Sequence, residues 1–202
     1  MDQDSSELEI RRLLENWALW RDSGEFQRLR SAWHDDGRMV TTWSEGSADD
    51  FIALASAAWS KGMDVVHSLG GSAVDIAGDR AIAQTRVLIS QRAPVQGILC
   101  DIECIGRFYD FLERRDGRWA IVLRHPVYDR DRLVPVDADA RPVLDAERLG
   151  RYPAGYRHLG YAQSLLGMDV RTDLPGRSGP AIEALYARGR EWLAGASMTP
   201  AG

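Results

Sequence analysis

The sequence predicts an α+β fold in which N-terminal helices pack against a curved antiparallel sheet. In about the first sixty residues, apolar side chains recur at helical spacing. From about residue 65 the chain changes to long strand-like runs separated by short turns such as Gly78-Asp79 and 115–117. Helices followed by a meander of long strands are typical of α+β proteins, because helices must cover one face of the sheet.

Each expected element has a local signal. A serine cap at Ser5 or Ser6 begins the first helix, and Asp22-Ser23-Gly24 breaks it. Ser47 caps a third helix, which Gly62 ends. The expected helices cover about 6–21, 25–33 and 48–61, with a turn over 34–37, a strand over 38–43 and a small-residue loop over 44–48. The later strands are expected over about 65–76, 81–92, 97–114 and 118–127, with a turn at Ala93-Pro94.

The composition changes again after Val136, so we divide the chain into a main domain, 1–136, and a helical C-terminal extension, 137–202. Short helices are expected over 144–149, 156–166 and 179–193. Their apolar surface is too large to stay exposed, so the extension must dock on the main domain or on a neighbouring subunit. We expect part of it to cover a pocket; the alternative is that it only stabilises an oligomer.

The composition, net charge and cysteine spacing exclude some classes of partner and indicate where the protein works. The 202 residues are 45% hydrophobic and 27% charged, and the net charge of −5 argues against a nucleic-acid partner. The N-terminus lacks an apolar leader, and no run reaches transmembrane length, so we expect no membrane partner. Cys100 and Cys104 lie about 13 Å apart on a strand, too far for a disulfide. We therefore expect a reduced, cytoplasmic protein.

Two residues carry the chemical hypothesis. His67 stands in the apolar strand of MDVVHSLGG, and Asp22 is an isolated acid at the end of the first helix. A histidine serves as a base near neutral pH, and a carboxylate bonded to one ring nitrogen sets its tautomer. Alternatively, His67 is a structural core histidine and Asp22 a turn residue. The histidines show no metal-ligand spacing, so no metal is expected.

Three segments support a family resemblance. The element order, the segment ALWRDSGEFQRLRSAWHDDG and the hairpin FYDFLERRDGRWAI resemble SnoaL-like members of the NTF2-like (cystatin-like) superfamily over about 7–130. Among these, the chain is most similar to the dehydratase and dehydrochlorinase branch, which includes hexachlorocyclohexane dehydrochlorinase, scytalone dehydratase and bile-acid 7α-dehydratase. The resemblance implies a cone-shaped α+β fold.

The resemblance also implies a cofactor-independent lyase. His67 would be the general base, oriented by Asp22, and Arg124 on the last strand would face the pocket and assist the leaving group. The reaction would eliminate water, a halide or a small carbonyl fragment such as formaldehyde. An isomerase using the same proton transfer is an alternative. A non-catalytic NTF2-like protein that binds ligands or oligomerises is another, because fold alone does not define function.

The pocket wall and the partner surface follow from strand alternation. Arg124 and Tyr128 share one face of the last strand, and Trp119, Leu123 and His125 share the other. A bulge could exchange Arg124 and His125. Aromatic wall residues would suit an aromatic or polycyclic small-molecule substrate. The expected substrate-binding residues are Trp17, Trp20, Met39, Cys104, Phe108 and Tyr128. Asp101, Glu103, Ile105, Arg107 and Tyr109 face away from the pocket, and we expect this surface to form a homodimer or homotrimer.

Overall fold

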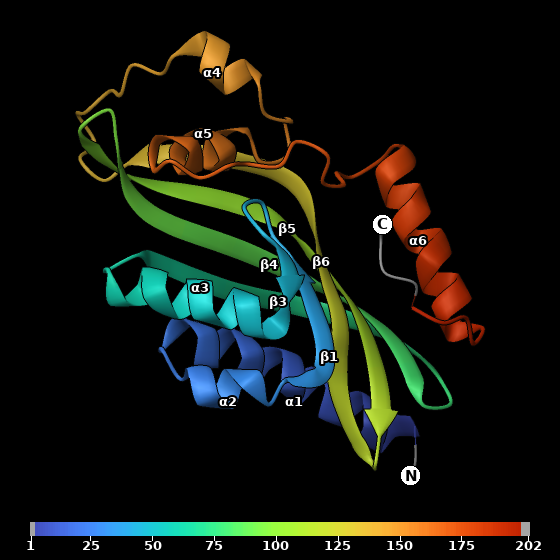
Figure 1. Cartoon of the computed structure of the whole chain (residues 1–202). Helices are drawn as coiled ribbons and strands as arrows, with labels where there is room; N and C mark the ends of the chain where they lie inside the picture. Colours follow the sequence, from blue (N-terminus) through green and yellow to red (C-terminus); the bar gives the residue numbers. More distant parts are fainter. Residues whose placement is uncertain (1–2, 199–202) are drawn as a thin grey trace.

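A computed structural model describes residues 3–198 and shows a strongly curved six-stranded sheet with helices packed on both of its faces (Figure 1). The helices are α1 Gln3–Asp22, α2 Phe26–Arg30, α3 Ala48–Ser60, α4 Ala146–Gly150, α5 Arg157–Leu165 and α6 Pro180–Leu193. The strands are β1 Trp33–Val40, β2 Glu45–Ser47, β3 Asp64–Ala77, β4 Arg80–Val95, β5 Ile98–Arg115 and β6 Arg118–Pro135. None of the described helices is both long and apolar enough to span a membrane.

The N-terminal helices form close to the predicted ranges, but α1 already includes Gln3, so Ser5 and Ser6 lie inside the helix and the predicted serine cap was wrong. α1 buries its apolar stripe, including Ile10, Leu14 and Trp17, against the sheet. α3 starts with the predicted cap: the Ser47 hydroxyl accepts from the Asp50 amide, and the Asp50 carboxylate accepts from the Ser47 amide. Gly62 follows α3 with a positive φ of 79°, which a glycine adopts without strain. The Ser47 cap and Gly62 thus mark the two ends of α3.

The sheet order is β2-β1-β6-β5-β4-β3. The meander β3–β6 is antiparallel as predicted, but β1 pairs with β6 in parallel, so the expectation of a wholly antiparallel sheet was wrong. β1 also begins at Trp33 and includes residues 34–37, which were predicted as a turn; its pairing with β6 is irregular there. The predicted loop contains the short β2, which pairs with β1.

The long strands exceed their predicted limits. β4 continues through Ala93-Pro94, where we predicted a turn, and the turn occurs instead at Gln96 and Gly97, with φ values of 50° and 79°. A register shift between Phe111 and Leu112 in the β5–β6 pairing marks a bulge in β6. As a result Trp119 packs in the α1 cluster, so placing it on the same face as Leu123 was wrong.

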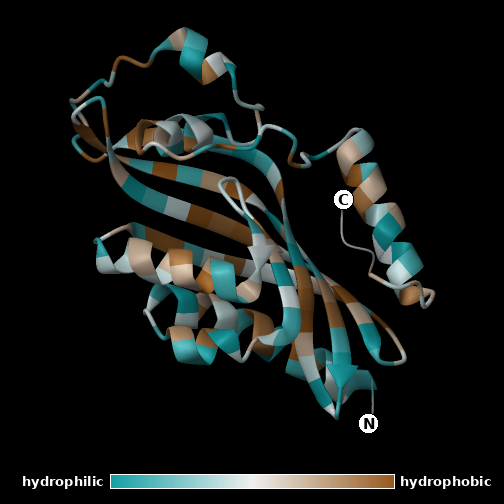
Figure 2. Cartoon of the chain, in the orientation of Figure 1, coloured by the Kyte–Doolittle hydropathy of each residue, from teal (hydrophilic) through white to brown (hydrophobic). Residues whose placement is uncertain are grey.

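The alternation predicted for β5 holds. Phe108 and Leu112 pack with α1 and α3, while Cys100, Ile102 and Cys104 join a cluster with Leu159 and Tyr161 of α5. In Figure 2, hydrophobic bands on the strands lie between α3 and α5. The helices α1 and α3 thus cover one part of this face of the sheet, and α5 covers another.

The extension forms three helices close to the predicted ranges, and α6 packs on the opposite face of β5 (Figure 1). The ring of Tyr186 lies 5.5 Å from that of Tyr109, and Arg107 donates to the Tyr186 hydroxyl. One end of the surface predicted to bind another subunit is therefore covered by the chain's own helix. The homodimer or homotrimer stays a prediction.

Candidate active site

The fold brings Asp22 and His67 into direct contact. Asp22 is the last residue of α1, and His67 lies in β3, which packs against that helix. Asp22 Oδ1 lies 2.8 Å from His67 Nδ1, and Asp22 Oδ2 accepts from the His67 backbone amide at 2.6 Å. Both oxygens of one carboxylate are thus committed to one residue. The contact fixes the position of the β3 backbone and the orientation of the imidazole together.

The protonation state follows from these contacts. A carboxylate only accepts hydrogen bonds, so His67 Nδ1 carries the proton and Nε2 keeps its lone pair. The His67 side chain is 8% exposed, and burial lowers its pKa below 6.5, with the nearby Asp22 carboxylate opposing that shift. His67 is therefore a neutral imidazole at neutral pH with one nitrogen available as a base.

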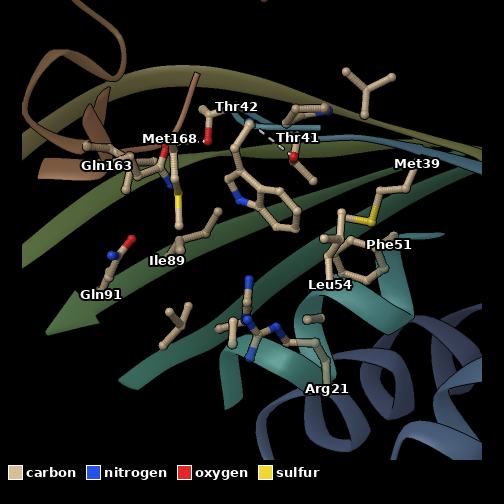
Figure 3. Close-up of a pocket in the computed structure, with 18 of the residues that line it drawn as sticks. Arg21, Met39, Thr41, Thr42, Phe51, Leu54, Ile89, Gln91, Gln163 and Met168 are labelled. Atoms are coloured by element: carbon tan, nitrogen blue, oxygen red, sulfur yellow. Dashed lines mark hydrogen bonds between the residues drawn. The ribbon is translucent and has the colours of Figure 1, made fainter. Parts of the chain in front are cut away.

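His67 lines a pocket of about 300 Å³ between α3, the sheet and α5. Its wall is mainly apolar and comes from Trp17, Met39, Trp43, Phe51, Leu54, Ile89, Phe108, Leu159 and Met168, among others. Figure 3 shows Met39, Phe51 and Leu54 on one side and Ile89 and Met168 on another. The extension contributes Leu159, Gln163, Met168 and Asp169 to the lining. Part of the C-terminal extension therefore forms a wall of this pocket.

Four of the six predicted substrate-binding residues, namely Trp17, Met39, Phe108 and Tyr128, line the pocket. Trp20 does not, because it faces α2, where the Arg28 guanidinium lies 4.9 Å from its ring. Cys104 does not either: its thiol lies 3.6 Å from the Gly155 carbonyl, beneath the extension. Both residues were assigned to the pocket incorrectly.

Arg124 lies behind the pocket wall rather than on it, which corrects the expectation that it faces the substrate. Its guanidinium is 1% exposed and makes a bidentate ion pair with Asp110, at 2.6 and 2.9 Å. It also lies 4.1 Å from the Trp17 ring and 4.3 Å from the Phe108 ring. Since both rings pack around His67, Arg124 acts here as a support of the wall.

Sequence reasoning missed several polar residues of the lining, among them Arg21, Gln91, Thr42 and Gln163. The Thr42 hydroxyl donates to Gln163 Oε1 at 2.6 Å, and this hydrogen bond joins the loop after β1 to α5. Arg21 could have been found from its place directly before Asp22 at the helix end. Nothing in the sequence marks Gln91 or Gln163 as pocket residues, because single glutamines are also common on exposed strands and helices.

Metal binding has no support in this region. Over residues 3–198, no group of three or more His, Cys, Asp and Glu side chains is arranged to hold a metal ion. The second carboxylate–imidazole contact, between Asp131 and His158 at 2.9 Å, joins β6 to α5 and lies outside the pocket lining. Only the Asp22–His67 pair combines a carboxylate-bound imidazole with this cavity within the described chain.

A sequence profile of the SnoaL-like domain family matches residues 4–125, which include α1, β3 and both members of the pair. The chain belongs to this family. Pea pathogenicity protein 2 from Fusarium vanettenii is 34% identical over 199 residues, covering 93% of this chain and 85% of that protein. An uncharacterized protein from Emericella nidulans is also 34% identical, over 92% of this chain and 85% of its own length. Both similarities extend into the C-terminal extension.

Solved structures share the fold. A type 2 hexachlorocyclohexane dehydrochlorinase (LinA) superposes with a TM-score of 0.57 at 17% identity, covering 69% of this chain and 96% of that one. A putative scytalone dehydratase from Novosphingobium aromaticivorans gives 0.52 at 15% identity, covering 71% and 95%. The fold is thus that of a family related to dehydratases and dehydrochlorinases, with a helical C-terminal extension beyond the shared part.

Proposed function

We propose that the protein is a cofactor-independent lyase in which His67 is the general base. The observation that carries this proposal is the Asp22–His67 contact inside an otherwise apolar pocket. A buried imidazole held by a carboxylate, with its second nitrogen available to a cavity, is an arrangement suited to proton abstraction. A purely structural histidine would have no need of a cavity beside it.

The reaction begins when His67 Nε2 takes a proton from a substrate carbon. The electron pair of that C–H bond forms a new carbon–carbon π bond as the leaving group departs from the neighbouring carbon with its bonding electrons. Asp22 stays ionised and stabilises the imidazolium that has formed. If the leaving group is hydroxide, it takes the proton from Nε2 and leaves as water; a halide leaves as the anion, and the proton passes to solvent.

The apolar wall favours a small aromatic or polycyclic substrate. The Trp17, Trp43 and Phe51 rings form one side, with centroids 6.0 Å apart for Trp17–Phe51 and 6.2 Å for Trp43–Phe51. Such walls bind flat apolar molecules through burial of their surface. Within this class, loss of water, of a halide or of a small carbonyl fragment uses the same base.

The test is incubation of the purified protein with a panel of aromatic and alicyclic β-hydroxy ketones and halogenated hydrocarbons, followed by mass spectrometry. We expect loss of 18 Da or of a hydrogen halide from at least one compound. His67→Gln should abolish turnover, whereas His34→Gln should keep it, because the buried His34 ring bonds the Glu113 carbonyl away from the pocket. Turnover that persists in a folded His67→Gln variant would exclude this mechanism. Proton exchange without mass loss would instead favour the isomerase.

A further inference from the structure

Arg21 is a buried cation that faces the pocket without a hydrogen-bond acceptor. Its side chain is 7% exposed and lines the cavity, into which it extends from the end of α1 (Figure 3). Its single charged neighbour is Asp22, 3.8 Å away, and no hydrogen bond from its guanidinium forms within residues 3–198. Burial lowers the pKa of Arg21, and the Asp22 carboxylate opposes that shift.

Gln91 is a second polar side chain that lines the pocket. The residue is 3% exposed, yet its amide has no hydrogen-bond partner in the described part of the chain. The neighbouring Gln163, by contrast, accepts from Thr42. Gln91 pairs with Val65 and therefore lies one strand across and two residues, about 7 Å, along the sheet from His67.

The polar ends of both side chains are accessible from the cavity and are not among the fully buried atoms without a partner, so a molecule that displaces the solvent there must offer them polar groups or leave them unsatisfied. We propose that Arg21 and Gln91 select the substrate: an apolar carbonyl compound whose carbonyl oxygen binds Arg21 beside the C–H bond facing His67, and whose far end carries a second polar group for Gln91. This inference rests on the proposed function for the role of His67, but the recognition of the two polar groups is independent of turnover.

Charge balance favours a neutral carbonyl over a carboxylate. In the resting site Arg21 and Asp22 are close and opposite in charge, and His67 is neutral. A carboxylate substrate would leave one uncompensated negative charge in this apolar cavity, whereas a ketone adds none. When His67 takes the proton, the charge that develops on the carbonyl oxygen lies against the Arg21 guanidinium. Arg21 therefore binds the enolate oxygen more strongly than the ketone, which is what lowers the barrier.

Binding in the absence of turnover tests the proposal. The protein carries His67→Gln to prevent reaction, and quenching of the pocket residues Trp17 and Trp43 reports binding. The probes are tetralin, 2-tetralone, 6-hydroxy-2-tetralone and 2-naphthoate, which differ in the carbonyl, the distal hydroxyl and the charge. We expect 2-tetralone to bind more tightly than tetralin, 6-hydroxy-2-tetralone more tightly still, and 2-naphthoate more weakly than the ketones.

Variants assign each preference to a residue. Arg21→Gln should weaken 2-tetralone binding by about tenfold to a hundredfold and leave tetralin unchanged, the range for a hydrogen bond to a charged group. Gln91→Leu should remove only the advantage of the 6-hydroxyl, about threefold to tenfold. Arg12→Gln, on the exposed side of the same helix, is the matched control.

Three results would overturn the inference: equal binding of tetralin and 2-tetralone, tightest binding of 2-naphthoate, or a folded Arg21→Gln variant with unchanged preference. If Arg21→Gln does not fold, the probe ranking with the Arg21-containing protein still decides. A failure of the proposed function appears differently, as the absence of turnover by the wild-type protein despite the predicted binding pattern.

Discussion

Replacing Asp22 by asparagine should reverse the tautomer of His67. Asp22 accepts two hydrogen bonds from His67, one from the backbone amide at 2.6 Å and one from Nδ1 at 2.8 Å. An asparagine has one oxygen and one NH₂ group, so it can keep only one of these acceptors. If its oxygen retains the backbone amide, its NH₂ group faces Nδ1, which must then accept. The proton moves to Nε2, and the base is lost.

The magnitude follows from the same contacts. Loss of the orienting carboxylate with a wrong tautomer lowers the rate of a serine protease by about 10⁴, and we expect a loss of about two to four orders of magnitude here. The effect on the free energy of unfolding should be small by comparison, about 1.5–3 kcal/mol for a hydrogen bond to a charged group. Activity and stability should therefore separate clearly in this variant.

Long-range ¹H–¹⁵N NMR of the imidazole measures the tautomer without any substrate. In the wild-type protein the spectrum should show a protonated Nδ1, and in Asp22→Asn a protonated Nε2. Asp131→Asn is the matched control, because Asp131 makes the same kind of contact with His158 outside the pocket. A His67 ring that keeps its Nδ1 proton in Asp22→Asn would refute the assignment of Asp22 as the orienting group.

Three further predictions follow from buried groups. Because burial lowers the pKa of His67 below 6.5, the unfolded chain binds its proton more readily, so stability should hold above pH 6.5 and decline below it. Activity should persist to lower pH, until the folded protein itself protonates His67; a stability profile that His67→Gln leaves unchanged would contradict this. Arg124→Met should cost about 3–5 kcal/mol in urea unfolding by leaving the Asp110 charge unpaired, and Arg124→Met with Asp110→Leu should cost less. Trp192→Ala should cost about 3–5 kcal/mol, since Trp192 packs on Phe111; an unchanged midpoint would mean that α6 is not docked.

Local sequence patterns were sufficient to predict much of this fold. The apolar spacing of α1, the cap at Ser47 and the alternation along β5 each depend on residues close together in sequence, and each prediction was correct. The pairing partner of β1 depends on how the chain returns after α2, which no local pattern encodes. A bulge in β6 was considered only as an exchange of Arg124 and His125, whereas the observed bulge lies before Leu123 and places Trp119 on the other face.

The same difference between local and long-range information applies to the predictions for the candidate site. Asp22 and His67 were identified by resemblance, and the structure places them in contact, although it does not test their roles. Arg124 was assigned by strand register, which gives the face but not the depth: Asp110 holds the guanidinium behind Trp17 and Phe108. Cys104 shares a face with Phe108, but α5 covers that end of β5, and the sequence contains no signal for where α5 docks.

The position of Asp22 at the end of α1 has a cost that its hydrogen bonds to His67 must offset. The C-terminal end of a helix dipole is negative, so a carboxylate there is unfavourable by about 0.3–1 kcal/mol, whereas Arg21 at the same end is favoured. An asparagine would avoid this penalty, but with one oxygen it would lose one of the two hydrogen bonds to His67. That loss, about 1.5–3 kcal/mol, is larger than the dipole penalty, so stability alone is enough to favour the aspartate. The proposed catalytic role therefore depends on the pocket beside His67, and the activity of Asp22→Asn is the measurement that separates it from a structural role.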